Sequence, residues 1–587
     1  MKYYIQSMID RLNAEDTALL KRIYAPQVVA VPPSDAASSM CVTPEGEIRI
    51  YGQTDRKEPD EHGTAVYVSS TDCGLSWKLH LAPEGRFLGA AGYNPGTGRY
   101  ISFLPSAHRP DVDEEELDGA YAILSDKGFD DVAGRPVRLG SEVTEILKQP
   151  YFIESRDRWI ILGQYRLPDF SNMFILVFYS DDDGESWRHV RIPSSAPRFE
   201  PVPPHKGERW QQFSCEPTIA ELSDGRLMLL VRTSQNYHYV YYSSDCGESW
   251  TEPEPSIFHG TATMPVLEKL SDGRLVMFWC NNQPLPELDH EKTWPPVGDD
   301  IVKGVWEDVF TNRDANDLAI SGDDGATWTG FRELFLNPIR NSADFRSTGG
   351  IIDLDKSVHQ GQMLELPYNK LLVHFGQHPA SRRVIILDLD WLYETRRSEN
   401  FRYGLGGVST QMYVKSNLGS YHGFSGHCAY NRTDGALLLP DPDGNYEEVL
   451  QLCRLDDDRL VYQKQGAVWN FPASKRGEVS LRLRVAGSGV AISLCDHWYN
   501  PCDEYARREA HFSFEHSEKR EEGWDELGFV YDTEARVCEV RLNGVSRAVL
   551  PMRCDAPYGL CYLHLQTLAE RRDLCGTLVK SFEKHNI

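Results

Sequence analysis

The amino-acid sequence predicts an all-β protein: a six-bladed β-propeller followed by a jelly-roll β-sandwich, with a short N-terminal helix. Three observations lead to this prediction. A short motif, S-x-D-x-G-x-x-W, occurs four times between residues 70 and 328. Six turn sequences, each followed by a strand-like run, alternate with the motif. Beyond about residue 395 the motif stops, and strands of a different pattern follow.

Each copy of the motif follows a run rich in β-branched and aromatic residues, so we expect it in a hairpin turn. Asp and Ser side chains can bond the amides of such a turn, and glycine permits the positive φ at which the chain reverses. The tryptophan offers a flat surface to the neighbouring strand. We therefore interpret the motif as a folding element and not as a substrate contact. Its copies are Ser70–Trp77, Ser180–Trp187, Ser243–Trp250 and Ser321–Trp328.

The number of blades follows from the spacing of the repeats. The tryptophans at positions 77 and 187 are 110 residues apart, about twice the later spacings of 63 and 78 residues. A degenerate copy at Ser125–Gly128 fills this gap. Six four-stranded blades over about 370 residues is the size expected of a propeller. The six turn–strand units lie at 43–52, 94–103, 155–165, 221–232, 269–279 and 365–375.

The segments outside the repeats complete the predicted domain organisation. Ile5, Met8, Ile9 and Leu12 recur at helical spacing, so residues 1–25 are predicted to be a helical segment. The propeller is predicted over 26–395, a linker over 396–420 and a sandwich over 421–587. Strands of alternating apolar and polar residues support the sandwich, and they lie at 478–487, 490–496, 525–532 and 536–544.

Composition narrows the possible partners and compartments. The formal net charge of −26 argues against nucleic acid and against an anionic membrane as partners. No run of 18 apolar residues is present, and the N-terminus lacks a signal-peptide core. The 13 cysteines show no CxxC spacing, so we expect neither a disulfide framework nor a metal site. Free thiols and the lack of a signal lead us to expect a cytoplasmic protein, and a homo-oligomer is compatible with the sequence.

The four motif copies resemble the Asp boxes, or BNR repeats, of the sialidase (neuraminidase) superfamily, and the resemblance covers roughly residues 25–395. The run from Trp524 through Asp532 to Gly544 resembles the concanavalin-type, lectin-like sandwich. This second resemblance leaves two roles open for the C-terminal domain: glycan binding, or service as a structural brace or dimer contact. Asp boxes also occur in propellers that only bind, so the repeats alone do not assign an activity.

The resemblance also implies candidate site residues. Sialidases carry three arginines that clamp a carboxylate, an Asp acid/base, and a Tyr nucleophile polarised by a Glu. Glu216 resembles this Glu, and Arg232 resembles the second clamp arginine at the end of the next strand. Arg313, eight residues before the fourth motif, resembles the third clamp arginine. The competing interpretations are a solvated edge residue for Glu216 and a surface salt bridge for Arg313.

An acidic loop is the candidate for the proton donor. Asp60 lies where the family places its acid/base Asp in a mobile loop, and Glu61 is the next choice. A carboxyl group that closes over a desolvated sugar can have its pKa raised enough to donate a proton. Arg56 in the same loop resembles a family arginine that flanks the substrate. A solvated charged loop is the alternative.

Two positions depart from the family pattern. Asp35 stands near the place of the first clamp arginine, and His359 or Gln360 stands where the Tyr nucleophile is expected. Two arginines hold a carboxylate less firmly than three, and Asp35 would repel it. We expect Asp35 and Gln360 to contact the substrate, and His359 to act as a base or a polar contact, with a packed structural histidine as the alternative.

These residues predict an exo-acting glycoside hydrolase of the sialidase type that cleaves a terminal, possibly acidic, sugar from an oligosaccharide and that is not an ordinary sialidase. Two alternatives stay open. The first is a lyase that acts at a uronic acid, and the second is a propeller that binds glycan without cleaving it. The sequence holds no nucleotide-binding or metalloprotease motif, so no cofactor is expected.

Overall fold

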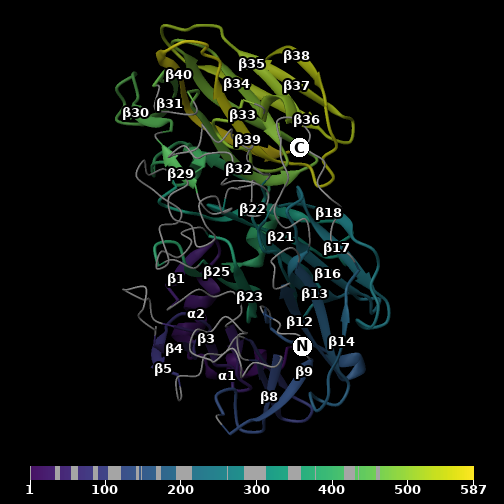
Figure 1. The fold of residues 1–587 in the computed structure, drawn as a ribbon. Helices are drawn as coiled ribbons and strands as arrows, with labels where there is room; N and C mark the ends of the chain where they lie inside the picture. The colour runs from purple at the N-terminus through teal and green to yellow at the C-terminus, as the bar shows by residue number, and fades with distance from the viewer. Residues whose placement is uncertain are drawn as a thin grey trace.

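The computed structural model describes residues 2–32, 40–53, 64–82, 90–103, 120–131, 133–140, 145–146, 149–166, 173–193, 214–260, 262–282, 313–340, 358–376, 379–415, 430–433, 435–457, 463–504 and 506–587. The chain is almost entirely β-structure, arranged as a propeller with a sandwich beside it (Figure 1). Among the described residues, no helix is long and apolar enough to cross a membrane.

The propeller consists of six antiparallel sheets in chain order. Blade 1 holds β2 (Met40–Val42), β3 (Ile48–Gln53), β4 (Ala65–Ser70) and β5 (Lys78–Leu81). Blade 2 holds β6 (Ala90–Asn94), β7 (Arg99–Phe103), β8 (Ala120–Ser125) and β9 (Arg135–Gly140). In blade 3 the inner strand is split into β10 (Glu145–Ile146) and β11 (Tyr151–Ile153), which both pair with β12 (Arg158–Arg166). The blade continues with β13 (Met173–Ser180) and β14 (Arg188–Arg191), and the short 3₁₀ helix η3 (Glu154–Arg156) precedes β12.

The remaining three blades complete the ring. Blade 4 holds β15 (Cys215–Glu221), β16 (Leu227–Arg232), β17 (Tyr237–Ser243) and β18 (Glu254–His259). Blade 5 holds β19 (Val266–Lys269), β20 (Leu275–Trp279), β21 (Ala315–Ser321) and β22 (Thr329–Leu336). Blade 6 holds β23 (Gly361–Leu366), β24 (Lys370–Phe375) and β25 (Arg383–Asp388), followed by the 3₁₀ helix η5 (Leu389–Tyr393). The predicted six-bladed propeller is therefore confirmed.

The ring is closed by the N-terminal part of the chain. Strand β1 (Gln27–Ala30) pairs with β25 and becomes the outermost strand of blade 6. On the inner side, the Met40 N–H of blade 1 donates to Gln362 Oε1 of blade 6 at 2.8 Å. The first residues of the domain are thereby joined to its last blade, and β1 covers the outer edge of β25.

The four repeated motifs form the turn between the third and the outer strand of their blades, as predicted. In the third-blade turn, the Asp182 carboxylate accepts hydrogen bonds from Ser180 Oγ at 2.8 Å and from the Ser186 N–H at 2.9 Å. The Trp187 indole N–H donates to the carbonyl of Gly184, whose φ is +85°. The same contacts recur in the other three copies, so the motif shapes its own turn.

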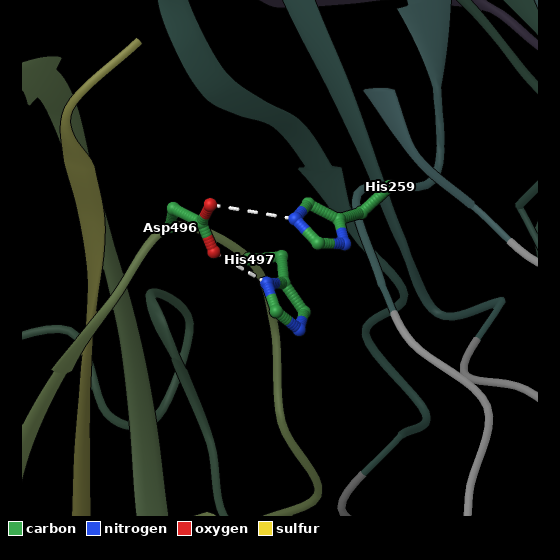
Figure 2. A group of neighbouring side chains, drawn as sticks. All are labelled: His259, Asp496 and His497. Carbon is green, nitrogen blue, oxygen red and sulfur yellow. Dashed lines mark hydrogen bonds and ion pairs between the residues drawn. The ribbon is translucent and has the colours of Figure 1, made fainter. Parts of the chain in front are cut away.

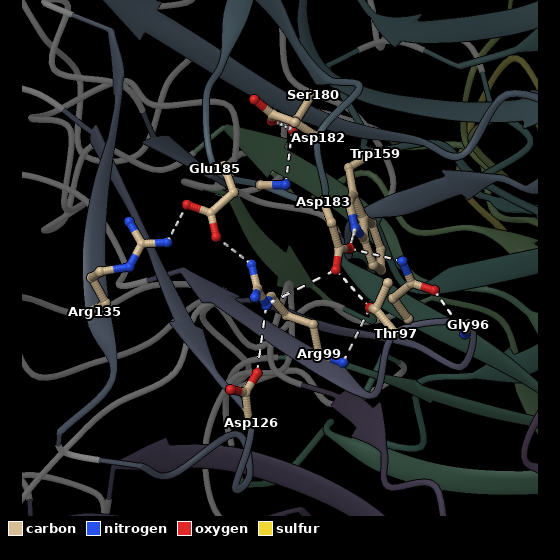
Figure 3. A network of polar contacts seen from close by, with 12 residues as sticks. Gly96, Thr97, Arg99, Asp126, Arg135, Trp159, Ser180, Asp182, Asp183 and Glu185 are labelled. Carbon is tan, nitrogen blue, oxygen red and sulfur yellow. Dashed lines mark hydrogen bonds and ion pairs between the residues drawn. The ribbon is translucent and has the colours of Figure 1, made fainter.

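The same turns also join adjacent blades (Figure 3). Asp183 of the third-blade turn accepts a hydrogen bond from Asn94 Nδ2 of blade 2 at 2.7 Å, and another from Trp159 Nε1 at 2.9 Å. Glu185 beside it forms ion pairs with Arg99, at 2.6 Å, and with Arg135, both in blade 2. These contacts hold neighbouring blades in fixed positions around the axis.

The N-terminal segment differs from the single short helix predicted over 1–25. It forms two helices, α1 (Ile5–Arg11) and α2 (Ala14–Arg22). Asn13 separates them because its side-chain oxygen accepts hydrogen bonds from the Glu15 and Asp16 N–H groups and so caps α2. The apolar spacing indicates a helix correctly, but it does not reveal the break at Asn13, which comes from a side-chain cap and not from the apolar period.

The C-terminal domain is a sandwich of two antiparallel sheets that enclose their own core. One sheet has the order β30-β31-β40-β33-β36-β37-β38, with β26 also paired to β40. Its strands are β26 (Arg396–Glu399), β30 (Leu437–Pro440), β31 (Glu448–Arg454), β33 (Arg476–Val485), β36 (Asp525–Asp532), β37 (Val537–Leu542), β38 (Val545–Pro551) and β40 (Asp573–Asn586).

The facing sheet has the order β27-β32-β39-β34-β35. Its strands are β27 (Val408–Ser409), β32 (Gly466–Ser474), β39 (Leu560–Thr567), β34 (Val490–Cys495) and β35 (Phe512–His516), and the short helix α3 (Ala506–Glu509) precedes β35. A separate pair joins β28 (Met412–Lys415) to β29 (Tyr430–Thr433).

The segment predicted as a linker, 396–420, departs from that prediction where it is described. Strand β26 pairs with β40, and β27 pairs with β32, so both belong to the sandwich sheets. The charged sequence around Arg396 gave no sign of this because β26 is an edge strand whose side chains stay partly in water.

The propeller and the sandwich share an apolar interface. Phe331 of β22 stacks on Tyr558 of the sandwich, with ring centroids 3.6 Å apart, and Trp279 and Trp498 belong to the same cluster. Polar contacts accompany it: Asn470 of β32 donates to the Phe331 carbonyl at 2.9 Å and accepts from the Glu333 N–H at 3.1 Å. The two domains therefore pack as one body.

Two buried carboxyl groups, Asp317 and Glu333, face each other on β21 and β22 at this interface. Burial raises the pKa of Glu333 from its usual 4.5 to about 7, although Arg397 and Arg340 oppose the shift, and burial also raises the pKa of Asp317. The folded chain therefore holds protons here that the unfolded chain releases above about pH 4.5. The contribution of this pair to the free energy of unfolding is fully present below about pH 4.5 and is lost as the pH rises through about 7.

We expect the substitution Glu333→Gln to remove part of this pH dependence. Relative to the wild type, the variant should become more stable as the pH is raised from 5 to 8, because it buries no charge at that position. Apparent melting temperatures of both proteins across this pH range provide the measurement. A difference between them that stays constant with pH would contradict the assignment.

Candidate active site

Glu216 is placed by an irregularity at the start of the inner strand of blade 4. The register between β15 and β16 shifts between Cys215 and Thr218, and Glu216 has a positive φ of 42°. A bulge of this kind turns a side chain away from the regular alternation of the strand. A non-glycine residue in the left-handed region costs energy and is found preferentially at functional sites.

The Glu216 carboxylate is held by donors from two blades. Arg232 Nη1, at the end of β16, donates to Glu216 Oε2 at 2.8 Å. Gln360 Nε2, just before β23 of blade 6, donates to Glu216 Oε1 at 3.2 Å. The side chain of Glu216 is 9% exposed and that of Arg232 5%, so this ion pair is largely shielded from water. A guanidinium contact of this kind stabilises the anionic carboxylate.

Arg313 and His359 join the same cluster from blades 5 and 6. The Val358 N–H donates to the Arg313 carbonyl at 2.7 Å, which ties the two segments together. Burial lowers the pKa of His359 well below its usual value, and the positive charges of Arg313 and Arg232 lower it further. His359 is therefore a neutral imidazole at pH 7. The same low pKa means that this imidazole binds a proton weakly, which weakens its predicted role as a base and favours a hydrogen-bonding role.

The structure thus brings five of the predicted residues together: Glu216, Arg232, Arg313, His359 and Gln360. They come from blades 4, 5 and 6: Glu216 lies at the start of β15, Arg232 at the end of β16, Arg313 before β21, and His359 and Gln360 before β23. The other four predicted residues, Asp35, Arg56, Asp60 and Glu61, lie outside the described residues. Their proposed contacts therefore remain predictions.

Two further residues around Glu216 were not anticipated from the sequence. Gln164 of β12 accepts a hydrogen bond from the Glu216 N–H at 3.1 Å and so fixes the bulge from blade 3. His238 of β17 is fully buried, and burial lowers its pKa to about 3, with the Arg232 charge acting in the same direction. The sequence offered one signal for His238: it is a polar residue near the start of β17, a strand that is otherwise mostly apolar or aromatic.

The electrostatics of the cluster differ in sign from those of the whole chain. The five side chains include two guanidinium groups and one carboxylate, whereas the chain carries a net charge of −26. Arg232 pairs with Glu216, and the Arg313 guanidinium donates to the Ala262 carbonyl. Guanidinium groups bind carboxylates through paired hydrogen bonds, and neutral amide and imidazole groups bind hydroxyls. The arrangement suits a small ligand that carries hydroxyl groups and one negative charge.

The opposite end of the propeller axis holds a separate cavity of about 440 Å³. The N-terminal residues Lys2 and Tyr4 line it together with Glu221, which lies at the far end of β15 from Glu216. Lys2 forms an ion pair with Glu268 in this cavity. The N-terminal segment thus occupies one mouth of the axis and leaves the cluster around Glu216 at the other.

One region of the chain matches a known protein family. It contains three of the four repeated turns, and also Glu216, Arg232 and Arg313. Residues 124–342 match the BNR repeat-like domain. The BNR repeat-like region runs from the end of β8 to the end of the described part of blade 5. His359 and Gln360 lie beyond it in the chain, on blade 6.

Solved structures with a similar course of the chain include three proteins. One is a protein of unknown function from Dyadobacter fermentans, with 17% identity, a TM-score of 0.39, and coverage of 62% of this chain and 97% of that chain. Another is Trypanosoma rangeli sialidase in complex with sialic acid, with 12% identity, a TM-score of 0.39, and coverage of 96% and 94%. The third is exo-β-1,3-galactanase from Phanerochaete chrysosporium with galactose, with 8% identity, a TM-score of 0.31, and coverage of 95% and 100%. Among curated proteins, none matches this chain.

Proposed function

We propose that this protein is an exo-acting glycoside hydrolase that removes a terminal, negatively charged sugar from an oligosaccharide. The observation that carries the proposal is the convergence of Glu216, Arg232, Arg313, His359 and Gln360 from three blades. A carboxylate paired with one guanidinium group, in a cluster that also holds a second guanidinium group and two polar side chains, matches an acidic sugar in both charge and hydrogen bonding.

In this proposal Glu216 acts at the anomeric carbon. Its anionic carboxylate stabilises the positive charge that develops on the sugar ring, either as a nucleophile or by directing water. Gln360 holds one carboxylate oxygen and Arg232 the other, which fixes the direction of Glu216. Arg313 binds the acidic group of the sugar, and His359 binds a hydroxyl. The proton donor to the leaving oxygen is Asp60 or Glu61, as the sequence predicts.

We further propose that the sandwich serves as a brace for the propeller. The support for this role is the shared apolar cluster around Phe331 and Tyr558, together with the buried hydrogen bonds of Asn470. An interface that buries aromatic rings on both sides resembles the core of a single domain.

A panel of aryl glycosides tests the proposed activity. We expect uronides or other acidic glycosides to be cleaved at least about 10-fold faster than the matched neutral glycosides, and the substitution Arg313→Met to abolish this preference. Arg476, an exposed arginine of the sandwich, provides the control substitution Arg476→Met, which should leave the preference intact.

The same panel separates the competing functions. With an oligosaccharide of uronic acids as substrate, an unsaturated product that absorbs in the far ultraviolet would indicate a lyase, because the elimination expels the sugar linked at C4. Saccharide binding without any cleavage would indicate a propeller that only binds. Rapid cleavage of an ordinary sialoside would contradict the inference drawn from Asp35 at the position of the first clamp arginine.

A further inference from the structure

A compact group of side chains that plays no part in the candidate active site lies where the propeller meets the sandwich. Figure 2 shows His259 and His497 with their ring nitrogens directed at the Asp496 carboxylate. His259 is the last residue of β18 in blade 4, whereas Asp496 and His497 directly follow β34 of the sandwich. The three side chains are thus contributed by both domains.

The distances place three potential metal ligands around one point. His259 Nε2 lies 3.3 Å from Asp496 Oδ2, and His497 Nδ1 lies 2.5 Å from Asp496 Oδ1. The three ligand atoms lie within 4.8 Å of one another. Ligand atoms at about 2.0–2.2 Å from a tetrahedral zinc ion are about 3.3 Å apart, so the His259–Asp496 distance already fits, and the His497–Asp496 contact has to widen to admit an ion.

The charge of this group calls for a cation. Asp496 is 2% exposed, and its ion-pair partners among the described residues are imidazoles, without a lysine or arginine. A buried carboxylate needs a compensating positive charge. A divalent ion bound to the two imidazoles and the carboxylate supplies that charge.

The surroundings hold the ligands in place before any ion binds. The Asp496 carbonyl accepts hydrogen bonds from Tyr558 Oη at 2.7 Å and from Asn281 Nδ2 at 3.2 Å. The rings of His259 and His497 stack with centroids 3.8 Å apart and planes 20° apart, so one ring has to rotate for both nitrogens to point at a single ion. A third imidazole, His511, approaches the same carboxylate, with Nε2 3.6 Å from Asp496 Oδ2. Such second contacts orient metal ligands in known sites.

We propose that His259, Asp496 and His497 form a binding site for a divalent cation of the zinc class, which cross-links the propeller to the sandwich. Two imidazoles and one carboxylate are donors that suit zinc, and a water molecule completes the coordination. The site is independent of the proposed glycosidase chemistry, because none of its members belongs to the cluster around Glu216.

Zinc titration of the full chain tests the proposal. The protein is treated with a chelator, and its accessible thiols, which include Cys554 and Cys575 among the described residues, are alkylated to remove competing ligands. Zn²⁺ binding is then measured by calorimetry. We expect one equivalent of Zn²⁺ to bind per chain and to raise the apparent melting temperature. The substitutions His259→Gln and Asp496→Asn should each weaken this binding at least 10-fold.

The sandwich offers a matched control. His516 and Asp525 form another buried His–Asp contact, at 3.3 Å, and among the described residues no second imidazole is stacked on His516. The substitution His516→Gln should therefore leave the zinc stoichiometry and affinity unchanged. The proposal is overturned if the wild type shows no saturable Zn²⁺ binding, which would mean that a protonated imidazole balances Asp496, or if His259→Gln binds Zn²⁺ as tightly as the wild type does. Neither readout depends on the glycosidase assay, so the proposed function is tested separately.

Discussion

Replacing Glu216 by glutamine is expected to lower kcat on the best acidic glycoside by about 10²-fold or more. The amide keeps the size of the side chain and can still contact Gln360 and Arg232, but it carries no negative charge to stabilise the developing cation of the sugar. KM should change much less than kcat, because the loss concerns the transition state more than the bound substrate. Initial rates of aryl glycoside cleavage, measured over a range of substrate concentrations, provide both constants.

Glu221 provides the matched control for this prediction. It lies on the same strand, β15, but at the opposite end, where its Oε1 accepts a hydrogen bond from Ser155 Oγ at 3.3 Å. The substitution Glu221→Gln should leave kcat within about twofold of the wild type, as expected for a residue that touches neither substrate nor reacting atoms. An unchanged kcat in Glu216→Gln would remove Glu216 from the mechanism.

The second large effect is expected at the propeller–sandwich interface. Phe331 is fully buried, stacks on Tyr558 and makes an edge contact with Trp279 at 5.4 Å between ring centroids. Truncation of a buried phenylalanine to alanine typically costs about 3–5 kcal/mol, because it removes apolar contacts and leaves a cavity. We therefore expect Phe331→Ala to lower the free energy of unfolding by about this amount, measured by urea denaturation.

A double-mutant cycle with Tyr558→Ala assigns the loss to the interface. If the stacked pair carries part of the stability, the double variant should lose about 0.5–1.5 kcal/mol less than the sum of the two single variants. Tyr403, whose side chain is 88% exposed, provides the control, since Tyr403→Ala should change stability by less than about 0.5 kcal/mol. Strict additivity of Phe331→Ala and Tyr558→Ala would show that the two domains are not coupled through this stack.

The blades were predictable from the sequence because their turns are local. In the third-blade turn, for example, Ser180, Asp182, Gly184 and Trp187 bond one another within eight residues, so the pattern is visible in the chain itself. The closing strand β1 was not predictable in this way. Gln27–Ala30 pairs with β25, more than 350 residues later, and only the completed ring creates its partner edge.

The candidate site was predictable in part. Glu216 and Arg232 belong to one hairpin with a recognisable turn, and the structure joins them directly. The contact of Gln360 with Glu216 spans 144 positions and depends on how blades 4 and 6 face the axis. The group of His259 and Asp496 spans 237 positions and two domains, so no spacing rule for metal ligands could have indicated it. Long-range placement by packing, and not a lack of suitable residue types, limits prediction in both cases.

The structure of the Glu216→Gln variant in complex with an acidic oligosaccharide tests the central claim most directly. Our account predicts that the terminal sugar lies at the cluster of blades 4, 5 and 6, with its acidic group within hydrogen-bond distance of Arg313. The anomeric carbon should face the side chain at position 216. A sugar bound only at the sandwich, or one whose acidic group points away from Arg313 and Arg232, would contradict the account.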